Sequence, residues 1–467
     1  MRRTSAEPRR QFDLVVSVVI QNRSRTRARG RPFIGQQSCP DLSRGEGAAN
    51  STSLHDSAAG AESPRHVVIV RLQNVGFADI ELPRSPRRNS PQLNPRRARL
   101  SGSPFERHRS HMERRIKTAA VIGIGKVGTL VATLLHEGGF KVIGHDSTAR
   151  DDLGFPVFAT DVADPAKLRE VLKGRDAVVS CLPYHLNLGV AKAAFQAGVH
   201  YFDLTEDVPT TKAIIDMSAQ AQRVMAPQCG LAPGFIGIVG ASLTHGFEHV
   251  RSVELRVGAL PQHPSGLLGY AFNWSPEGVV NEYLNDCEVI QDRRKMLVPP
   301  MEQLETIVVQ GISLEAFTTS GGLGTMCDTF LGRVDELNYK TMRYHGHCEL
   351  MRFFFRELHM KDNRKAAGEI LVNAKPPVND DVVFVHAAVE GRKQGDMFRE
   401  EFVRAYFPKR IAGKMWRAIS WTTAASVCAI VELVANGALP GQGFIKQEDI
   451  LLSQFLGTRC GGYYHEE

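Results

Sequence analysis

The pattern of apolar and polar residues predicts alternating strands and helices over residues 118–227. Short apolar runs typical of buried parallel strands occur at 118–122, 140–144, 157–160, 177–180, 201–204 and 224–227. Apolar residues spaced three and four apart predict helices between them, at 127–135, 165–172, 188–197 and 208–223. This alternation predicts an α/β fold, a Rossmann-type doubly wound parallel sheet of about six strands.

The pattern changes after Cys229. Residues 252–257 alternate between apolar and polar side chains, as in a half-buried antiparallel strand. Further strands are predicted at 271–274, 306–310, 382–389 and 401–407, and helices at 276–284 and 347–358. These elements predict a second, α+β domain with a mixed or antiparallel sheet. An apolar helix at 421–435 is expected to pack back on the first domain.

These patterns divide the chain into four parts. Residues 1–111 form a tail, 112–235 the Rossmann domain, 236–420 the second domain, and 421–467 a C-terminal helix and tail. The net charge of +7 is unevenly distributed between them. Residues 1–116 hold 22 arginines, no lysine and 10 acidic residues, whereas the remainder holds 35 basic and 40 acidic residues. The predicted folded body is therefore mildly acidic, which argues against a nucleic-acid groove in it.

The tail is rich in Arg, Ser, Pro and Gly and has few aromatic residues. Such a composition buries too little apolar surface to offset the entropy of ordering, so we expect residues 1–111 to be disordered. A transit peptide and a nucleic-acid-binding tail are alternatives. Arginine without lysine over this length is also typical of translated upstream sequence. We favour a functional protein that starts at Met112, which opens MERRIKTAAVIGIGKVG.

The eight cysteines are scattered, and no CxxC pair occurs. We expect free thiols in a reducing cytoplasm, with neither disulfides nor a zinc site. His345 and His347 lack a third ligand in the sequence, so no metal is expected. The apolar stretch 424–439 is interrupted by Glu432 and Asn436, and we expect no membrane contact.

The first predicted strand leads into the sequence Gly123-Ile124-Gly125-Lys126-Val127-Gly128. A GxGxxG motif between a strand and a helix lets the backbone approach a pyrophosphate, which the helix N-terminus then binds. Asp146 follows 18 residues after Gly128, where a carboxylate binds the adenosine ribose. This acid favours NAD over NADP, because it would repel a 2′-phosphate. Arg150 is the residue nearby that could accept that phosphate.

Loops at the carboxyl ends of the other predicted strands should line the same crevice. We expect the cofactor to contact Asp161, Val162 and Pro183, together with the glycine loop and its Lys126 and Val127. Asp203, His185 and Glu206 follow later strands and should face the substrate.

From Lys117 onward the chain resembles the saccharopine dehydrogenase-type oxidoreductases. The segments that carry the resemblance are DLTED at 203–207, GLAPGF at 230–235, SPEGVVNEY at 275–283, TSGGLGT at 319–325, ELNYKTMRYHGHCE at 336–349 and GFIKQED at 443–449. Within the family they are most similar to the lysine 6-dehydrogenase type. The resemblance implies a second domain for substrate binding and dimerisation, hence a homodimer, and oxidative deamination of the lysine ε-amine. The product would be 2-aminoadipate semialdehyde, which cyclises to a piperideine carboxylate.

This chemistry requires a base, since hydride leaves the ε-carbon only from a neutral amine. The candidate acid–base groups are Lys340, Glu206 and His185, with His345 and Glu277 as further options. Each of these groups also has a purely structural interpretation: Lys340 as a solvated lysine, for example, and Glu277 as an acid that complements a helix dipole.

The substrate's α-carboxylate needs a two-donor fork, which Arg343 offers unless it pairs structurally with an acid. Glu277 or Glu206 would bind the α-ammonium, and Asp203 has a favourable position after a strand. Gly234 precedes an apolar helix. It is either an interdomain hinge or a source of backbone N–H groups for a carboxylate.

Two other functions remain open at this point. One is a saccharopine or carboxynorspermidine-type enzyme that acts on a secondary amine. Such a substrate carries more carboxylates and would need more than one arginine. The other is an NAD-binding regulator without turnover.

The composition of residues 1–111 yields a first prediction. Because this segment cannot form a core and every motif lies after it, residues 112–467 should retain the melting temperature and turnover of the full chain within error. Thermal unfolding and steady-state assays of both proteins test this. A clear loss of either property would mean that the tail contributes to the fold or the site.

Overall fold

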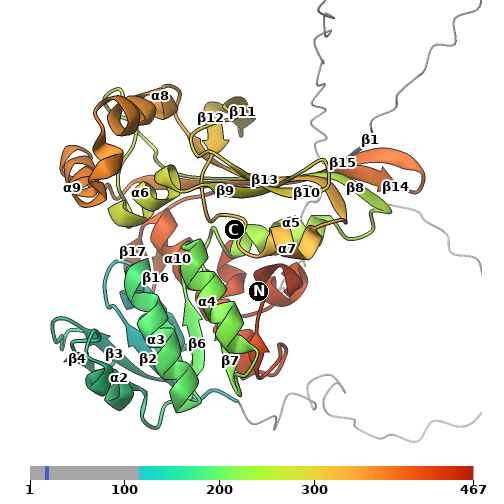
Figure 1. The fold of residues 1–467 in the computed structure, drawn as a ribbon. Coiled ribbons are helices and arrows are strands. Elements are labelled where there is room, and N and C mark those ends of the chain that lie inside the picture. Colours follow the sequence, from blue (N-terminus) through green and yellow to red (C-terminus); the bar gives the residue numbers. More distant parts are fainter. Residues whose placement is uncertain (1–15, 20–114, 466–467) are drawn as a thin grey trace, which may run out of the picture. The chain divides into compact units, whose positions relative to one another are not determined.

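The structure is a computed structural model that describes residues 115–465 and the short strand β1 (Val16–Val19). Residues 115–465 form two large sheets and a small two-stranded one (Figure 1). The first sheet has seven parallel strands in the order β18-β7-β6-β5-β2-β3-β4. Their bounds are β2 (Thr118–Ile122), β3 (Lys141–Asp146), β4 (Val157–Ala159), β5 (Ala177–Ser180), β6 (His200–Asp203), β7 (Val224–Ala226) and β18 (Gly443–Phe444). The Rossmann-type sheet is thus confirmed, and β18 extends it.

Alternate residues of β2 pack on opposite faces of this sheet. Ala119 and Val121 join a core with α1 (Gly128–Glu137), whereas Ala120 and Ile122 join another with the helices on the second face. Those helices are α2 (Pro165–Leu172), α3 (Tyr184–Ala197) and α4 (Val208–Ser218), of which α3 and α4 lie side by side in Figure 1. Burial on both faces explains why the strands are continuous apolar runs.

The second sheet has nine strands and is mixed, as expected. Its main order is β1-β15-β14-β8-β13-β12-β11, and β9 pairs with both β10 and β13. The bounds are β8 (His249–Pro261), β9 (Cys287–Gln291), β10 (Arg294–Val298), β11 (Glu305–Val309), β12 (Ile312–Thr318), β13 (Val334–Arg343), β14 (Asp381–Lys393) and β15 (Asp396–Tyr406). The pair β13 and β8 is parallel, and the other pairs of this sheet are antiparallel.

Helices and short turns complete the second half. The α-helices are α5 (Phe235–Leu243), α6 (Pro276–Leu284), α7 (Met326–Phe330), α8 (His347–Arg352), α9 (Arg364–Ala374), α10 (Ala418–Ala435) and α11 (Leu452–Leu456). A π-turn at Phe353–Glu357 follows α8, and 3₁₀ turns lie at Met360–Asp362, Gln447–Asp449 and Gly461–Tyr464. A small hairpin joins β16 (Lys409–Ile411) to β17 (Lys414–Trp416).

Helix α10 packs against α1 of the first domain. The Cys428 thiol of α10 lies 3.6 Å from the Val131 carbonyl of α1, and both residues are buried. Of the helices in residues 115–465, α10 alone is long and apolar enough to cross a membrane. However, 89% of it is buried inside the protein, as in a core helix. The seven cysteines of this part of the chain are free thiols.

The structure differs from the sequence prediction in several elements, including strands β9, β10 and β12 and helix α9, which were not predicted. Residues 271–274 form a largely buried loop and pair with no strand. Strand β13 was not predicted, since polar residues interrupt its alternation. Val16–Val19 lie in the segment expected to be disordered, yet they pair with the edge of β15, where β-branched residues suit a strand. The rest of residues 1–111 lies outside the described residues.

Candidate functional site

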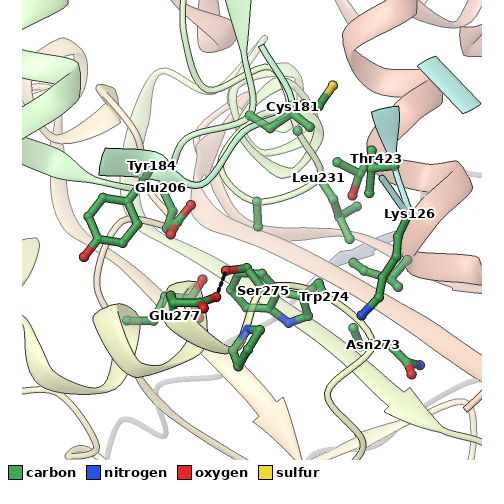
Figure 2. Close-up of a pocket in the computed structure, with 18 of the residues that line it drawn as sticks. Lys126, Cys181, Tyr184, Glu206, Leu231, Asn273, Trp274, Ser275, Glu277 and Thr423 are labelled. Carbon is green, nitrogen blue, oxygen red and sulfur yellow. Dashed lines mark hydrogen bonds between the residues drawn. The ribbon is translucent and has the colours of Figure 1, made fainter. Parts of the chain in front are cut away.

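A cavity of about 360 Å³ lies between the two sheets of the described unit (Figure 2). One wall comes from the carboxyl ends of the parallel strands, and the other comes from β8, β13, α6 and the start of α10. The residues that line the cavity include Gly125, Lys126, Val127, Gly128, Pro183, Tyr184, Glu206, Gly230, Trp274, Ser275, Glu277, Glu282, Tyr339, Thr341 and Arg343. Figure 2 shows Glu206 beside Tyr184, with Lys126 on the opposite side.

The glycine loop forms one end of this cavity. The Gly123 N–H donates to the His145 carbonyl at 2.8 Å, which ties the loop to β3. A Cβ on Gly128 would lie 1.8 Å from the Gly123 carbonyl oxygen, so only glycine permits this turn. Nothing lies within 4 Å of a Cβ built on Gly125, and α1 begins at Gly128 without a side-chain cap. This open backbone at a helix N-terminus fits a dinucleotide pyrophosphate.

Asp146 ends β3 beside the loop, as the sequence predicted. One carboxylate oxygen accepts the Ile124 N–H at 2.6 Å, and the other accepts the Ser147 N–H at 2.7 Å. Arg150 donates two hydrogen bonds to Asp152, at 2.9 and 2.7 Å, and one to Thr129 at 3.3 Å. Its guanidinium thus forms an ion pair with an exposed carboxylate.

Of the other residues predicted to contact the cofactor, one lines the cavity and two do not. Pro183 lines the cavity, whereas Asp161 and Val162 do not. The Asp161 carboxylate accepts the Ala163 N–H at 3.0 Å and so caps its own loop.

Glu206 lines the cavity from the loop between β6 and α4. In residues 115–465, no other side chain donates a hydrogen bond to its carboxylate. Burial, together with the smaller effect of the charges of Asp207 and Asp203, raises the pKa of Glu206 from its ordinary 4.5 to about 7. A carboxylate with such a pKa can exchange a proton near neutral pH.

Arg343 also reaches the cavity, from the end of β13. Its Nε donates to the Tyr283 hydroxyl at 2.9 Å, and its Nη1 donates to the Met342 carbonyl at 2.8 Å. The guanidinium lies over the Tyr270 ring, 4.7 Å from the ring centroid. Glu282 of α6 lines the same cavity.

Lys340 does not line the cavity, and we withdraw its interpretation as the acid–base group. Along β13, the cavity-lining residues Tyr339, Thr341 and Arg343 alternate with residues on the other face. On that other face the Lys340 ammonium donates to the Glu305 carboxylate at 2.6 Å and to the Gln303 carbonyl at 2.7 Å. The lysine is a member of a structural ion-pair network.

Three more predicted site residues lie outside the cavity. His185 is exposed on α3, with its ring edge-on to Tyr184. Asp203 is fully buried: it accepts from the Tyr201 hydroxyl at 2.6 Å and from the Gln228 and Thr205 N–H groups at 3.0 Å, so it anchors two loops. Gly234 packs on Gly230, where a Cβ would lie 2.0 Å from a carbonyl oxygen. This close backbone packing favours the interpretation of Gly234 as part of an interdomain hinge over that of a source of N–H groups for a carboxylate.

Two other candidates have clear positions. Glu277 is exposed at the cavity rim, where its carboxylate accepts the Ser275 hydroxyl at 3.0 Å (Figure 2). His345 lies away from the cavity and 2.8 Å from the Ser313 hydroxyl. In the part of the chain that is described, no three His, Cys, Asp or Glu side chains gather as metal ligands would.

Sequence reasoning missed Glu282 and Tyr339 as site residues. The available signal for Glu282 was an acid in the second turn of a predicted helix, within the motif SPEGVVNEY. For Tyr339, the signal was its spacing of four from Arg343 in a strand that was not predicted.

Comparisons with known proteins agree on a family. Residues 119–228 match the family model described as the saccharopine dehydrogenase NADP binding domain, and residues 230–458 match the saccharopine dehydrogenase C-terminal domain. The chain is similar to mouse mitochondrial alpha-aminoadipic semialdehyde synthase, with 25% identity over 43% of this chain and 23% of that protein. It is also similar to a Schizosaccharomyces pombe saccharopine dehydrogenase (NADP(+), L-glutamate-forming), with 23% identity over 32% of this chain and 34% of that protein.

A solved structure shares the fold. Apo saccharopine dehydrogenase (L-Glu forming) from Saccharomyces cerevisiae superposes with a TM-score of 0.60 and 15% identity, over 73% of this chain and 97% of that one. The chain spans no more than about a third of either curated relative named above, so their activities do not transfer to it directly.

The position of Asp146 yields a prediction about cofactor choice. Asp146→Ala should weaken NAD binding roughly 10- to 100-fold, because a hydrogen bond to a charged group contributes about 1.5–3 kcal/mol. NADP binding should change far less. Titration of each cofactor against wild type and variant measures both effects.

Asp161→Ala is the matched control, since its carboxylate caps a loop outside the cavity. It should leave both affinities unchanged. Tighter binding of NADP than of NAD by the wild type would contradict the assignment.

Proposed function

The chain belongs to the saccharopine dehydrogenase family, and on this premise we propose that it is an NAD-dependent oxidoreductase that oxidatively deaminates the ε-amine of L-lysine. The product is 2-aminoadipate semialdehyde, which cyclises to a piperideine carboxylate. One observation carries the proposal: the glycine loop that fits a dinucleotide shares a single cavity with Arg343 and three glutamates.

The charges of the cavity support lysine as the substrate. Glu206, Glu277 and Glu282 line it, against the cations Lys126 and Arg343. Lysine carries two ammonium groups and one carboxylate, so it complements an acidic cavity with one buried arginine. A ligand with several carboxylates would meet like charges there, which costs binding energy.

Glu206 supplies the base that this reaction requires. The ε-ammonium must lose a proton before its carbon can release a hydride, and a carboxylate with a pKa near 7 can accept that proton at physiological pH. NAD, when bound, accepts the hydride. The nitrogen lone pair then forms the C=N bond, water adds to this imine, and ammonia leaves.

Arg343 anchors the substrate carboxylate in this proposal. Tyr283, Met342 and the Tyr270 ring hold the guanidinium, while no residue in the described part of the chain bonds to Nη2. A guanidinium fixed on one side and open on the other is suited to bind a carboxylate.

A secondary amine such as saccharopine is the second candidate. Lys126 offers the cavity a second cation, and the Schizosaccharomyces pombe relative and the Saccharomyces cerevisiae structure carry that substrate in their names. Purified full-length protein should be assayed for NADH formation with L-lysine, saccharopine and cadaverine, using NAD and NADP. Turnover of lysine with NAD supports the proposal, and preferred turnover of saccharopine overturns it. Cofactor binding without any turnover would indicate a regulator.

The role of Arg343 yields a testable prediction. Arg343→Ala should raise the KM for lysine by a factor equivalent to about 2–5 kcal/mol, because the substrate carboxylate is left buried without a partner. NAD affinity should stay the same. The KM for cadaverine, which lacks the carboxylate, should rise much less.

An equal rise in the KM for lysine and for cadaverine would identify Arg343 as a structural arginine. The anchor would then be sought at the backbone of Gly230, which lines the same cavity.

The raised pKa of Glu206 predicts a pH profile. Below pH 7 the carboxyl is protonated and cannot accept the substrate's proton, so kcat/KM should rise with pH and level off above about 7. Glu206→Gln should lower kcat roughly 10²- to 10⁴-fold and remove this limb.

Thermal unfolding at pH 8 is the control for folding. Burial disfavours the ionised carboxylate, so the neutral amide should not lower stability at that pH. A limb near pH 7 that persists in the variant would contradict the assignment.

A further inference from the structure

Glu282 is a buried acid without a partner. Its side chain lies in the second turn of α6, only 6% of its surface is exposed, and it lines the cavity. Within residues 115–465 no hydrogen bond or ion pair satisfies its carboxylate. Glutamate is almost never buried unless it is paired, and the charge of Arg343 favours the ionised form of Glu282 without direct contact. The carboxylate is therefore open to a cation that enters the cavity.

Arg343 lines the same cavity and is only 3% exposed. Its position depends on the residue next to Glu282, because Nε donates to the Tyr283 hydroxyl. That hydroxyl lies 3.0 Å from His347 Nε2, and His347 Nδ1 lies 3.0 Å from the Leu268 carbonyl. A carbonyl only accepts, so Nδ1 carries the proton and Nε2 accepts from Tyr283. This chain of bonds holds the guanidinium beside the turn that carries Glu282.

The electrostatics of Glu282 point to a cation. Burial raises the pKa of its carboxyl well above the ordinary 4.5, the charge of Glu206 raises it further, and Arg343 opposes the shift. An ammonium group that enters the cavity would stabilise the ionised carboxylate and offset this cost of burial.

We propose that Glu282 and Arg343 together bind the head group of a free α-amino acid, with Glu282 on the α-ammonium and Arg343 on the α-carboxylate. This inference deepens the proposed function and relies on it only for the identity of the rest of the substrate. Opposite charges on two rigid elements, α6 and β13, match the paired charges of a zwitterion. Nα-acylated amino acids and peptidyl lysines lack the α-ammonium and are therefore excluded as substrates.

The other two glutamates of the cavity are less suited to this role. Glu277 is exposed and already accepts a hydrogen bond from Ser275. Glu206 extends from the loop after β6, and its Oε1 lies close to Gly278 of α6. Its role as the base in the proposed reaction assigns it to the reacting amine instead of the α-ammonium.

Ligands without the reacting group test the inference by binding alone. L-Norleucine has the complete head group and no ε-amine, whereas 6-aminohexanoate has the carboxylate and terminal amine but no α-ammonium. Isothermal titration of full-length protein, saturated with NADH so that no hydride can be accepted, measures both affinities. Glu282→Gln should weaken the binding of L-norleucine at least about tenfold, which corresponds to about 1.4 kcal/mol. The affinity for 6-aminohexanoate should stay the same.

The second ligand is an internal control for folding, because a misfolded variant would lose both. Glu277→Gln is the competing variant and should bind L-norleucine like the wild type. Unchanged norleucine affinity in Glu282→Gln, an equal loss of both ligands, or no binding of norleucine to the wild type would overturn the inference.

These outcomes are independent of the proposed reaction. A protein that binds L-norleucine through Glu282 but does not oxidise lysine would retain the head-group site and refute only the proposed function. Turnover of lysine that is unaffected by Glu282→Gln would refute only the head-group site.

Discussion

The site depends on one hydrophobic core that runs through both halves of the described unit. This core includes β2 and α1 of the first half, and α5, β8 and α10 of the second. Phe235 of α5 stacks on Tyr464 near the end of the chain, with ring centroids 4.0 Å apart, and Trp421 of α10 packs edge-on against Tyr464. Because this interior is shared, the glycine loop and β13 are held as opposite walls of one cavity. Close packing of this kind transmits strain, so changes to the C-terminal segment would reach the site.

Within the cavity, environment gives similar side chains different properties. Glu277 lies at the rim, exposed and hydrogen-bonded. Glu206 is half-buried near two other acids and has a raised pKa, and Glu282 is buried without a hydrogen-bond partner. Acids in different surroundings can take different roles in one site. The aromatic rings of Tyr270 and Tyr283 help to exclude water from Arg343, which strengthens its interaction with any carboxylate that enters.

The opposite face of the second sheet explains why Lys340 resembled a site residue. Glu305 there accepts hydrogen bonds from both Lys340 and Arg256, and Arg256 also donates to the Asn338 side chain. The ionisable residues Lys340 and Arg343, which share the motif at 336–349, therefore belong to two different networks, one on each face of β13. Only the network that faces the cavity can contact a ligand, and the other holds strands β8, β11 and β13 together.

The sequence alone determined the dinucleotide half of this protein. Its signals are local: a buried strand, a glycine turn whose backbone no other residue permits, a helix, and an acid at the end of the next strand. The structure reproduces all of them at Gly123, Gly128 and Asp146. The sequence also indicated Arg343 and Glu206 as cavity residues through their family motifs and their positions in the chain.

Only the tertiary structure decided which residues face the cavity in the second half. A one-residue shift along a strand exchanges its two faces, and the pairing of β13 with β8 and β12 sets that register over long distances in the chain. Lys340 and Arg343 are three residues apart and so lie on opposite faces. Likewise, the composition of α6 could not show that Glu282 is buried without a partner, because that depends on what packs around the helix. Local sequence encodes backbone conformation, whereas the contacts that create a site are made between segments far apart.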